Sequence, residues 1–272
     1  MLKFFIKLFL KYIFIIFVKK LNMKSVLCIT ATCGRCYLMR RTLTNFINQD
    51  YKGPHTLLIY NNAHIPYSLD IPKDLPKEKT IILINNNISK ETGNPYSNLG
   101  EIYRDVLHYI PETDLITFMD DDDQYIPNHI TEGINGYLRA KLQKKIAYKP
   151  KYSYFKYDGK ISVTENTLEP SIFVESSHIK EWGFSDKTTE QHLQWVDPLV
   201  KENKILVDAY GKPTLIYDWS SPTPTFKTSG DPNNPENFNN YRNFSKDFGD
   251  GILSPLSKKE MEKYESSSLY QL

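Results

Sequence analysis

The main part of the sequence lacks a strong net charge of either sign. Six of the 34 basic residues lie in residues 1–24, which hold no acidic residue, so the remaining chain has 28 basic against 32 acidic residues. Nucleic-acid binding depends on a basic surface, and this balance gives no reason to expect a nucleic-acid partner. The length of 272 residues and the hydrophobic content of 40% are typical of a globular protein with a sizeable core.

The sequence also lacks a long uninterrupted hydrophobic run. In residues 1–20 the longest uncharged stretch is Tyr12–Val18, whereas a membrane-spanning helix needs about 20 apolar residues. Lys3, Lys7 and Lys11 recur every four residues, which predicts an amphipathic helix in peripheral contact with an anionic membrane. Packing of this helix on the body, or an extension before an internal start, is the alternative. No small-residue cleavage site follows, so we expect a cytoplasmic protein, membrane-associated if this segment binds lipid.

Cysteines are few, at Cys28, Cys33 and Cys36. The stretch CGRC has the spacing of a redox pair or of half a zinc site, but no second cysteine pair completes a zinc site. A thiol–disulfide oxidoreductase that uses Cys33 and Cys36 is therefore one candidate function, because a helix N-terminus lowers a thiol pKa. The alternative is that these cysteines are small residues at a turn between a loop and a helix.

Apolar runs alternate with helical patterns along residues 26–119. Expected strands are Val26–Thr30, His55–Tyr60, Thr80–Ile84 and Asp114–Met119, and expected helices are Tyr37–Asn48 and Leu99–Tyr109. This alternation predicts an α/β fold with a mainly parallel sheet. Ligands of such sheets lie at the carboxyl ends of the strands. Polar residues follow these ends at Thr30–Arg35, Asn61–Asn62, Asn85–Asn87 and Asp120–Asp123.

Four adjacent aspartates, Asp120–Asp123, follow the fourth expected strand. An EF-hand loop counted from Asp120 would need glycine and glutamate where Tyr125 and Thr131 stand, so that motif is excluded. Carboxylates held together favour a hard divalent cation such as Mg²⁺ or Mn²⁺. The alternative is a solvated acidic turn in which Asp123 caps a helix that starts near Pro127.

The stretches SVLCITATCGR, NFINQDYKGPHTLLIYNN, NLGEIYRDVL and DLITFMDDDDQYIPNHI together resemble nucleotide-sugar glycosyltransferases of the GT-A fold, family-2 kind. The resemblance implies a Rossmann-like, mixed but mainly parallel sheet flanked by helices, in one domain over residues 25–225. Residues 1–24 would be a basic, apolar extension, and residues 226–272 a loop or lid and tail. Asn61-Asn62 departs from the family, which has an acidic pair there.

The resemblance also implies a donor site and a metal site. Binding of the nucleotide-sugar is expected from Thr30, Ala31, Thr32, Arg35, Asn61, Asn62, Arg104, Asp120, Asp121 and Trp182. Asp120 and Asp122 would hold Mn²⁺ or Mg²⁺ at the donor diphosphate. For Arg35 and Arg104 the alternative is a surface arginine, and Trp182 and Trp195 either stack on sugar rings or belong to the core.

The stretch EWGFSDKTTEQHLQWVDPL resembles the family's segment in which a carboxylate at the start of a helix deprotonates the acceptor. Glu190 matches that carboxylate, with Asp186 and His192 as alternatives, while the following Gln191 cannot act as a base. Otherwise Glu190 belongs to a capping box that begins at Lys187. The resemblance favours inversion at the anomeric carbon.

The expected function is a metal-dependent glycosyltransferase, of the hexosyltransferase type, that uses a nucleoside-diphosphate sugar and a glycan or another hydroxyl acceptor. Besides the oxidoreductase, a nucleotide-sugar binding protein without catalysis is an alternative. A nucleotidyltransferase would need a glycine-rich phosphate loop, and only Gly34 lies near the first strand end.

Overall fold

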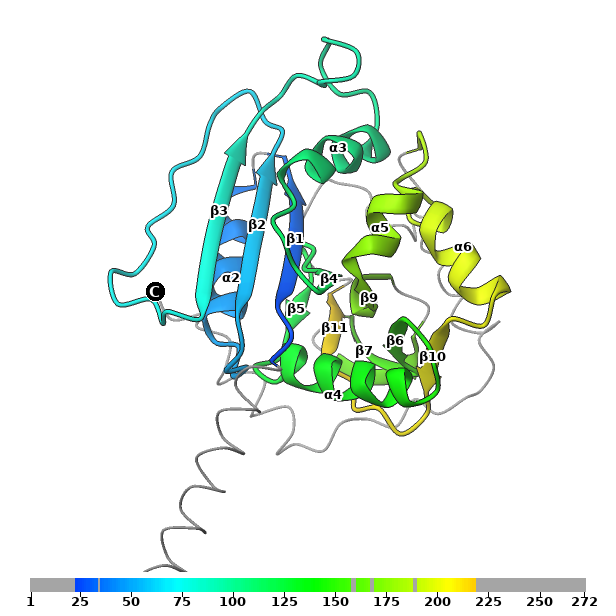
Figure 1. Ribbon diagram of the computed structural model, residues 1–272. Helices are drawn as coiled ribbons and strands as arrows, with labels where there is room; N and C mark the ends of the chain where they lie inside the picture. Colours follow the sequence, from blue (N-terminus) through cyan, green and yellow to red (C-terminus); the bar gives the residue numbers. More distant parts are fainter. Residues whose placement is uncertain (1–22, 34, 158–159, 167–168, 188–189, 219–272) are drawn as a thin grey trace, which may run out of the picture.

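The computed structural model describes residues 23–33, 35–157, 160–166, 169–187 and 190–218 (Figure 1). The helices are α2 (Cys36–Ile47), α3 (Leu99–Val106), α4 (His129–Leu142), α5 (Ser176–Trp182) and α6 (Leu193–Lys201), with short 3-10 helices η1 (Leu107–Tyr109) and η2 (Glu169–Ser171). The strands of the larger sheet are β1 (Val26–Thr32), β2 (His55–Asn61), β3 (Lys79–Asn85), β4 (Leu115–Phe118), β6 (Ala147–Pro150), β9 (Phe173–Glu175) and β10 (Ile205–Asp208).

Within the described residues the larger sheet has seven strands in the order β10-β6-β9-β4-β1-β2-β3. The first four strands of the chain run parallel, and β9 runs antiparallel to its neighbours β4 and β6. The register aligns Thr32 with Asn61 and Asn61 with Asn85, so these residues form one row at the carboxyl edge. Asp120–Asp123 follow β4 at the same edge, which confirms that the polar strand ends meet there.

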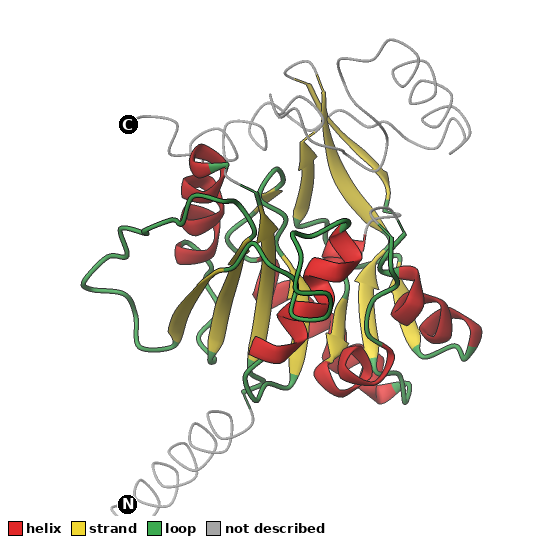
Figure 2. Cartoon of the chain, turned by 90° about the horizontal axis from the view of Figure 1, so that it is seen from above, coloured by secondary structure: helices red, strands yellow, loops and turns green. Residues whose placement is uncertain are grey.

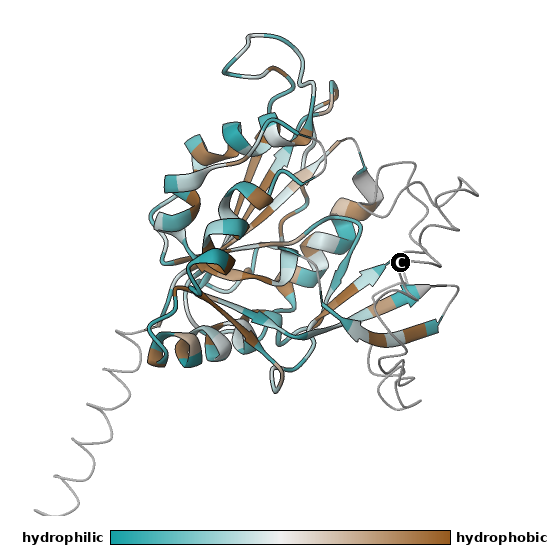
Figure 3. Ribbon diagram, turned by 90° about the vertical axis from the view of Figure 1, so that its right-hand side faces the viewer, coloured by the Kyte–Doolittle hydropathy of each residue, from teal (hydrophilic) through white to brown (hydrophobic). Residues whose placement is uncertain are grey.

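Helices cover both faces of this sheet because successive side chains of each strand point to opposite sides. Val26 and Cys28 of β1 belong to the core cluster that includes apolar residues of α2 and α4, whereas Leu27 and Ile29 pack with α3, α5 and α6. Figure 3 shows the hydrophobic residues concentrated on the strands and on the helix faces turned toward them. The almost completely buried strands β1 and β2 account for the near-continuous apolar runs of the sequence.

A smaller sheet stands beside the larger one (Figure 2). Its strands are β5 (Gln124–Tyr125), β7 (Tyr152–Tyr157), β8 (Lys160–Glu165) and β11 (Leu215–Asp218), in the order β5-β11-β7-β8. The strand β5 follows the aspartates directly and pairs antiparallel with β11, so the acidic segment lies where the two sheets come together.

The mixed, mainly parallel α/β architecture confirms the expected fold class. The expected strands and helices are all present, with shifts of at most three residues at their ends, and Leu107–Tyr109 form η1 rather than the end of α3. Residues 1–22 and 219–272 lie outside the described residues, so the N-terminal amphipathic helix and the C-terminal lid stay predictions. Across the part that is described, no helix combines the length and apolar character needed to cross a bilayer.

Candidate active site

Asp120–Asp123, the carboxylate turn, connect β4 to β5 at the carboxyl edge. The backbone N–H of Asp120 donates to the Tyr125 hydroxyl at 2.8 Å, which fixes the start of the turn. The alternative role of Asp123 as a helix cap is wrong, because the N-cap residue of α4 is Asn128. The Asp123 carboxylate is directed to β11 instead.

The end of β11 anchors the turn through Asp218. Its backbone N–H donates to Oδ1 of Asp123 at 3.1 Å. Its carboxylate accepts from Arg41 at 3.2 Å and from Gln124 at 2.8 Å, and the Lys156 ammonium lies 3.4 Å away. Both aspartates are buried, so these hydrogen bonds are needed to offset the loss of hydration.

Asp121 is buried and faces the loop after β1. Its carboxylate accepts from the Thr32 hydroxyl at 2.6 Å and from Arg35 Nε at 3.0 Å, and a second guanidinium nitrogen completes a bidentate pair. Arg35 also lies 4.0 Å from Asp122, so it is part of the acidic site and the solvent-exposed alternative is wrong. Burial raises the pKa of Asp121, Arg35 lowers it and the negative charge of Asp122 raises it, and the net result is a pKa of about 6.

A pocket of about 510 Å³, the edge pocket, opens at the ends of β1, β2 and β3, and its residue Cys33 directly follows Thr32, which bonds to Asp121. It is lined by Cys33, Asn62, Ala63, His64, Ile65, Tyr67, Asn87, Pro95 and Tyr96. Asn62 was predicted from the sequence. The aromatic and histidine side chains were missed because they come from loops without a periodic pattern, although the polar run at Asn85–Asn87 pointed to this edge.

Other residues that were predicted to bind the nucleotide-sugar do not line the edge pocket; they stabilise the carboxyl edge of the sheet instead. The Thr30 hydroxyl is buried and donates to the carbonyl of Met119 at 2.6 Å. The Asn61 amide is buried and donates to Asn85 Oδ1 at 2.8 Å, which ties the ends of β2 and β3 together. Ala31 is half-buried and packs against the core. Their direct contact with a nucleotide stays a prediction.

Arg104 projects from α3 into a network of ion pairs. Its Nε donates to Glu91 at 2.9 Å, and its terminal nitrogen donates to Asp186 at 3.1 Å. Asn98 donates to the same Asp186 oxygen at 2.7 Å. These two hydrogen bonds lower the pKa of Asp186, which makes it a weaker base.

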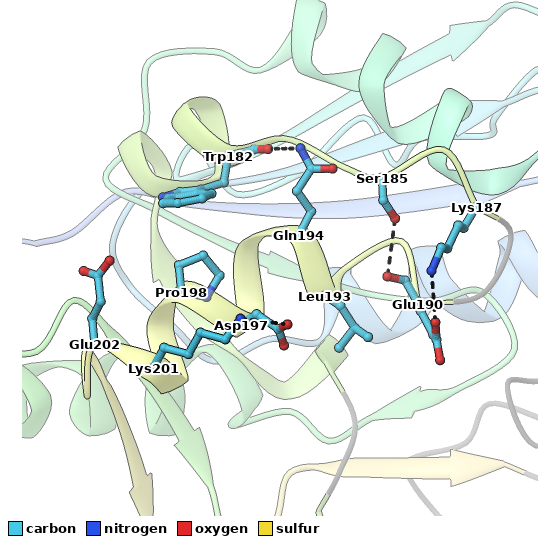
Figure 4. Close-up of a pocket in the computed structure, with 10 residues that line it drawn as sticks. All are labelled: Trp182, Ser185, Lys187, Glu190, Leu193, Gln194, Asp197, Pro198, Lys201 and Glu202. Carbon is cyan, nitrogen blue, oxygen red and sulfur yellow. Dashed lines mark hydrogen bonds and ion pairs between the residues drawn. The ribbon is translucent and has the colours of Figure 1, made fainter.

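A groove of about 560 Å³ lies on the outer side of α5 and α6 (Figure 4). The residues of this α5–α6 groove are Trp182, Ser185, Lys187, Glu190, Leu193, Gln194, Asp197, Pro198, Lys201 and Glu202. Glu190 lies at one end, 3.3 Å from the Lys187 ammonium, with a φ of 63° that residues other than glycine rarely adopt. Because α6 begins at Leu193, the capping-box alternative for Glu190 is wrong.

His192, two residues after Glu190, does not line the groove but is buried in the core. Its ring centroid is 4.8 Å from Phe118 and 5.1 Å from Tyr103, and burial lowers its pKa to about 3. It is therefore neutral and packed among aromatic rings. Trp195 is fully buried beside it, which assigns this tryptophan to the core.

The α3 N-terminus and the segment around Ser185 and Lys187 pack together and form a wall between the edge pocket and the α5–α6 groove. Tyr96 lines the pocket, and the α3 N-terminus follows it directly. The backbone N–H of Gly100 donates to the carbonyl of Lys187 at 2.9 Å, and a Cβ at position 100 would come within 1.8 Å of the Ser185 carbonyl. Only glycine allows α3 to approach this segment so closely.

No family model and no curated protein sequence matches the chain. Among solved structures, S. aureus TarS 1–349 matches with a TM-score of 0.55 and 15% identity, over 72% of this chain and 60% of TarS 1–349. The same TarS fragment in complex with UDP-GlcNAc matches with a TM-score of 0.54 and 14% identity, over 71% of this chain and 58% of the other. The chain has the GT-A fold. It spans 60% or less of the length of these TarS structures.

The acidic site has the ligand chemistry of a hard divalent cation, because carboxylate oxygens are the ligands that Mg²⁺ and Mn²⁺ prefer. The cations Arg35, Arg41 and Lys156 pair with Asp121, Asp122 and Asp218. Asp120 and Asp123 add two further carboxylates to the same turn. The carboxylates also add to burial in raising the pKa values of Tyr103 and Tyr125, as expected for a surplus of negative charge. In the described ranges no group of three or more His, Cys, Asp or Glu side chains is placed to hold a metal. Mg²⁺ at such sites needs one or two carboxylates, because substrate phosphates supply the other ligands.

Proposed function

We propose that this protein is a glycosyltransferase that moves a sugar from a nucleoside-diphosphate sugar to an acceptor hydroxyl with the help of Mn²⁺ or Mg²⁺. The observation that carries the proposal is the carboxylate turn at the carboxyl edge of a GT-A sheet, the edge that also holds the pocket of about 510 Å³. The TarS structure with UDP-GlcNAc supports a nucleotide-sugar donor and makes uridine diphosphate sugars the first donors to test.

In this proposal the edge pocket holds the nucleoside. The rings of Tyr67 and Tyr96 offer stacking surfaces for a base, and the amides of Asn62 and Asn87 offer donors and acceptors for a base or ribose. The side-chain amide N–H of Asn87 already donates to Nδ1 of His64 at 2.9 Å, so a ligand would meet a pre-organised polar pair. The neutral amides of Asn61 and Asn62 stand where the glycosyltransferase family that the sequence resembles has an acidic pair.

Asp120 and Asp122 are the proposed metal ligands. A bound divalent cation neutralises the donor diphosphate and so stabilises the negative charge that develops as the sugar–phosphate bond breaks. Arg35 and Thr32 hold Asp121 in place, which fixes the backbone of the two ligands on either side of it. Arg35 is 4.0 Å from Asp122, close enough for its charge to act on the phosphates as well.

Glu190 is the proposed general base. Of the three candidates, Asp186 is held by Arg104 and Asn98, and His192 is buried among aromatic rings. Glu190 alone of the three lines a groove that an acceptor can enter. It would take the proton of the acceptor hydroxyl as that oxygen attacks the anomeric carbon opposite the leaving nucleotide, which gives inversion.

A thermal-shift panel of nucleotide-sugars, with and without Mn²⁺, tests the proposal. We expect one donor to raise the melting temperature only in the presence of the metal, and to be slowly hydrolysed. Asp122→Asn should abolish this shift, whereas Asp74→Asn, at an exposed position outside the site, should retain it. A wild-type protein that responds to no donor with either metal would refute the proposal, and binding without hydrolysis would favour a binding protein.

A further inference from the structure

We infer that the α5–α6 groove is the acceptor site and that the acceptor is a saccharide, one ring of which lies on Trp182. The inference rests on the proposed glycosyl transfer and names the chemical class of the acceptor substrate. It combines the side chain of an exposed aromatic residue, a charge-balanced polar rim and the position of Glu190 at the end of the groove.

Trp182 is held in place at the end of α5. Its carbonyl accepts a hydrogen bond from the Gln194 amide, and its ring lies 6.1 Å from the ring of His178. His178 is buried and bonded to the carbonyl of Trp195 at 2.8 Å, so it is a firm support. Even so, Trp182 is 38% exposed, and its ring lies over Pro198 in the groove (Figure 4). A partly exposed indole offers a flat apolar surface for the C–H face of a sugar ring.

The rim of the groove is polar but balanced in charge. Glu190 pairs with Lys187 at 3.3 Å, Asp197 pairs with Lys201 at 3.7 Å, and Glu202 pairs with Lys204. Because each of these carboxylates has a lysine partner, the groove has no excess positive charge that would attract a phosphate or a nucleotide.

Sugar hydroxyls fit this rim because each of them both donates and accepts hydrogen bonds. They can donate to the carboxylates of Asp197 and Glu202 and accept from Lys201 and the Gln194 amide. Leu193 and Pro198 are the aliphatic residues that line the groove, which is too little apolar surface for a lipid chain. A neutral polyhydroxyl chain is therefore the occupant that this lining favours.

The groove is also placed to serve the transfer reaction. Lys187 and Ser185 belong both to the groove and to the segment that packs against the α3 N-terminus. Tyr96, just before α3, lines the edge pocket on the other side of this wall. Glu190 lies beside Lys187 and Ser185, at the other end of the groove from Trp182 (Figure 4), so a saccharide that extends from Trp182 along the groove would bring a hydroxyl to Glu190.

Saturation-transfer NMR with the neutral tetrasaccharides of maltose, cellulose, chitin and mannan types tests the inference on the full chain. We expect at least one of them to bind to the wild-type protein, with Trp182→Ala weakening its affinity about tenfold or more. Trp182→Phe keeps an aromatic face and should restore most of the affinity. Tyr210→Ala removes a ring that is 96% exposed and does not line the groove, and should bind like the wild type.

The donor thermal shift is recorded on the same samples to separate the two proposals. If a donor binds with Mn²⁺ but no tetrasaccharide binds, or if Trp182→Ala binds one as well as the wild type does, the saccharide groove is refuted and the transferase proposal stands. If a tetrasaccharide binding signal disappears in Trp182→Ala while no donor binds to any variant, the saccharide site stands and the transferase proposal fails.

Discussion

Replacing Arg35 with methionine removes the cation that faces Asp121 and keeps most of the side chain's length. In the native protein the Asp121 side chain is 1% exposed and that of Arg35 is 17% exposed. The bidentate pair is therefore largely shielded from water, and Arg35 is 86 residues away from Asp121 in the sequence. The variant leaves a buried carboxylate beside a second one, Asp122.

Removing one partner of a buried ion pair typically costs about 3 to 5 kcal/mol, because the remaining charge is desolvated without compensation. The Thr32 hydroxyl stays within 2.6 Å of Asp121, and Arg35 is not fully buried, so the lower end of this range applies. We expect Arg35→Met to lower the free energy of unfolding by about 3 kcal/mol.

Urea denaturation at pH 7 without added metal measures this loss. Arg40→Met makes the same chemical change at an exposed position of α2 and should cost less than about 0.5 kcal/mol. In the double variant Arg35→Met with Asp121→Asn the buried charge is gone, and part of the stability should return. A single variant that loses no more stability than Arg40→Met, or a double variant that is no more stable than Arg35→Met alone, would refute the assignment of this pair.

The remaining predictions concern packing, pH and the thiol. Gly100→Ala should lower the free energy of unfolding by about 1 to 3 kcal/mol in denaturant, because its Cβ would clash with the Ser185 carbonyl; unchanged stability would contradict the close approach. Burial lowers the pKa of His129 to about 3 from an ordinary 6.5, so the unfolded chain binds the proton first and stability falls as the pH drops below about 6.5. Between pH 6.5 and 5 this loss is about 2 kcal/mol for His129, and calorimetry of His129→Gln should show a shallower pH dependence than the wild type. Cys33→Ser should keep donor hydrolysis within about twofold, since the thiol only lines the edge pocket, and abolished activity would instead support thiol chemistry.

The sheet edge could be predicted from the sequence because it follows from short-range patterns. The apolar runs that became β1 and β2 are buried on both faces, and a parallel sheet necessarily brings their polar ends together. The row of Thr32, Asn61 and Asn85 is the direct result. The acidic turn was found by the same reasoning, because it directly follows a buried strand.

Roles within the site depend on contacts between distant residues, and these could not be predicted locally. The pairing of Arg35 with Asp121 joins segments that only the parallel order of β1 and β4 brings together. Tyr67 and Tyr96 come from loops, where no periodicity marks a residue as facing a pocket. Likewise, Glu190 adopts a left-handed backbone conformation and lies outside α6. Nothing about a glutamate in the sequence predicts this conformation.

Asp218 belongs to the smaller sheet, but its hydrogen bond to Asp123 holds the carboxylate turn, which follows a strand of the larger sheet and contains the proposed metal ligands. The side-chain period of a strand is two, so slipping β11 by a single position would turn this carboxylate toward the opposite face. Insertions between β7 and β8 leave that alignment untouched and should be tolerated. The length of β11, by contrast, is under constraint even though none of its residues is proposed to touch the substrate.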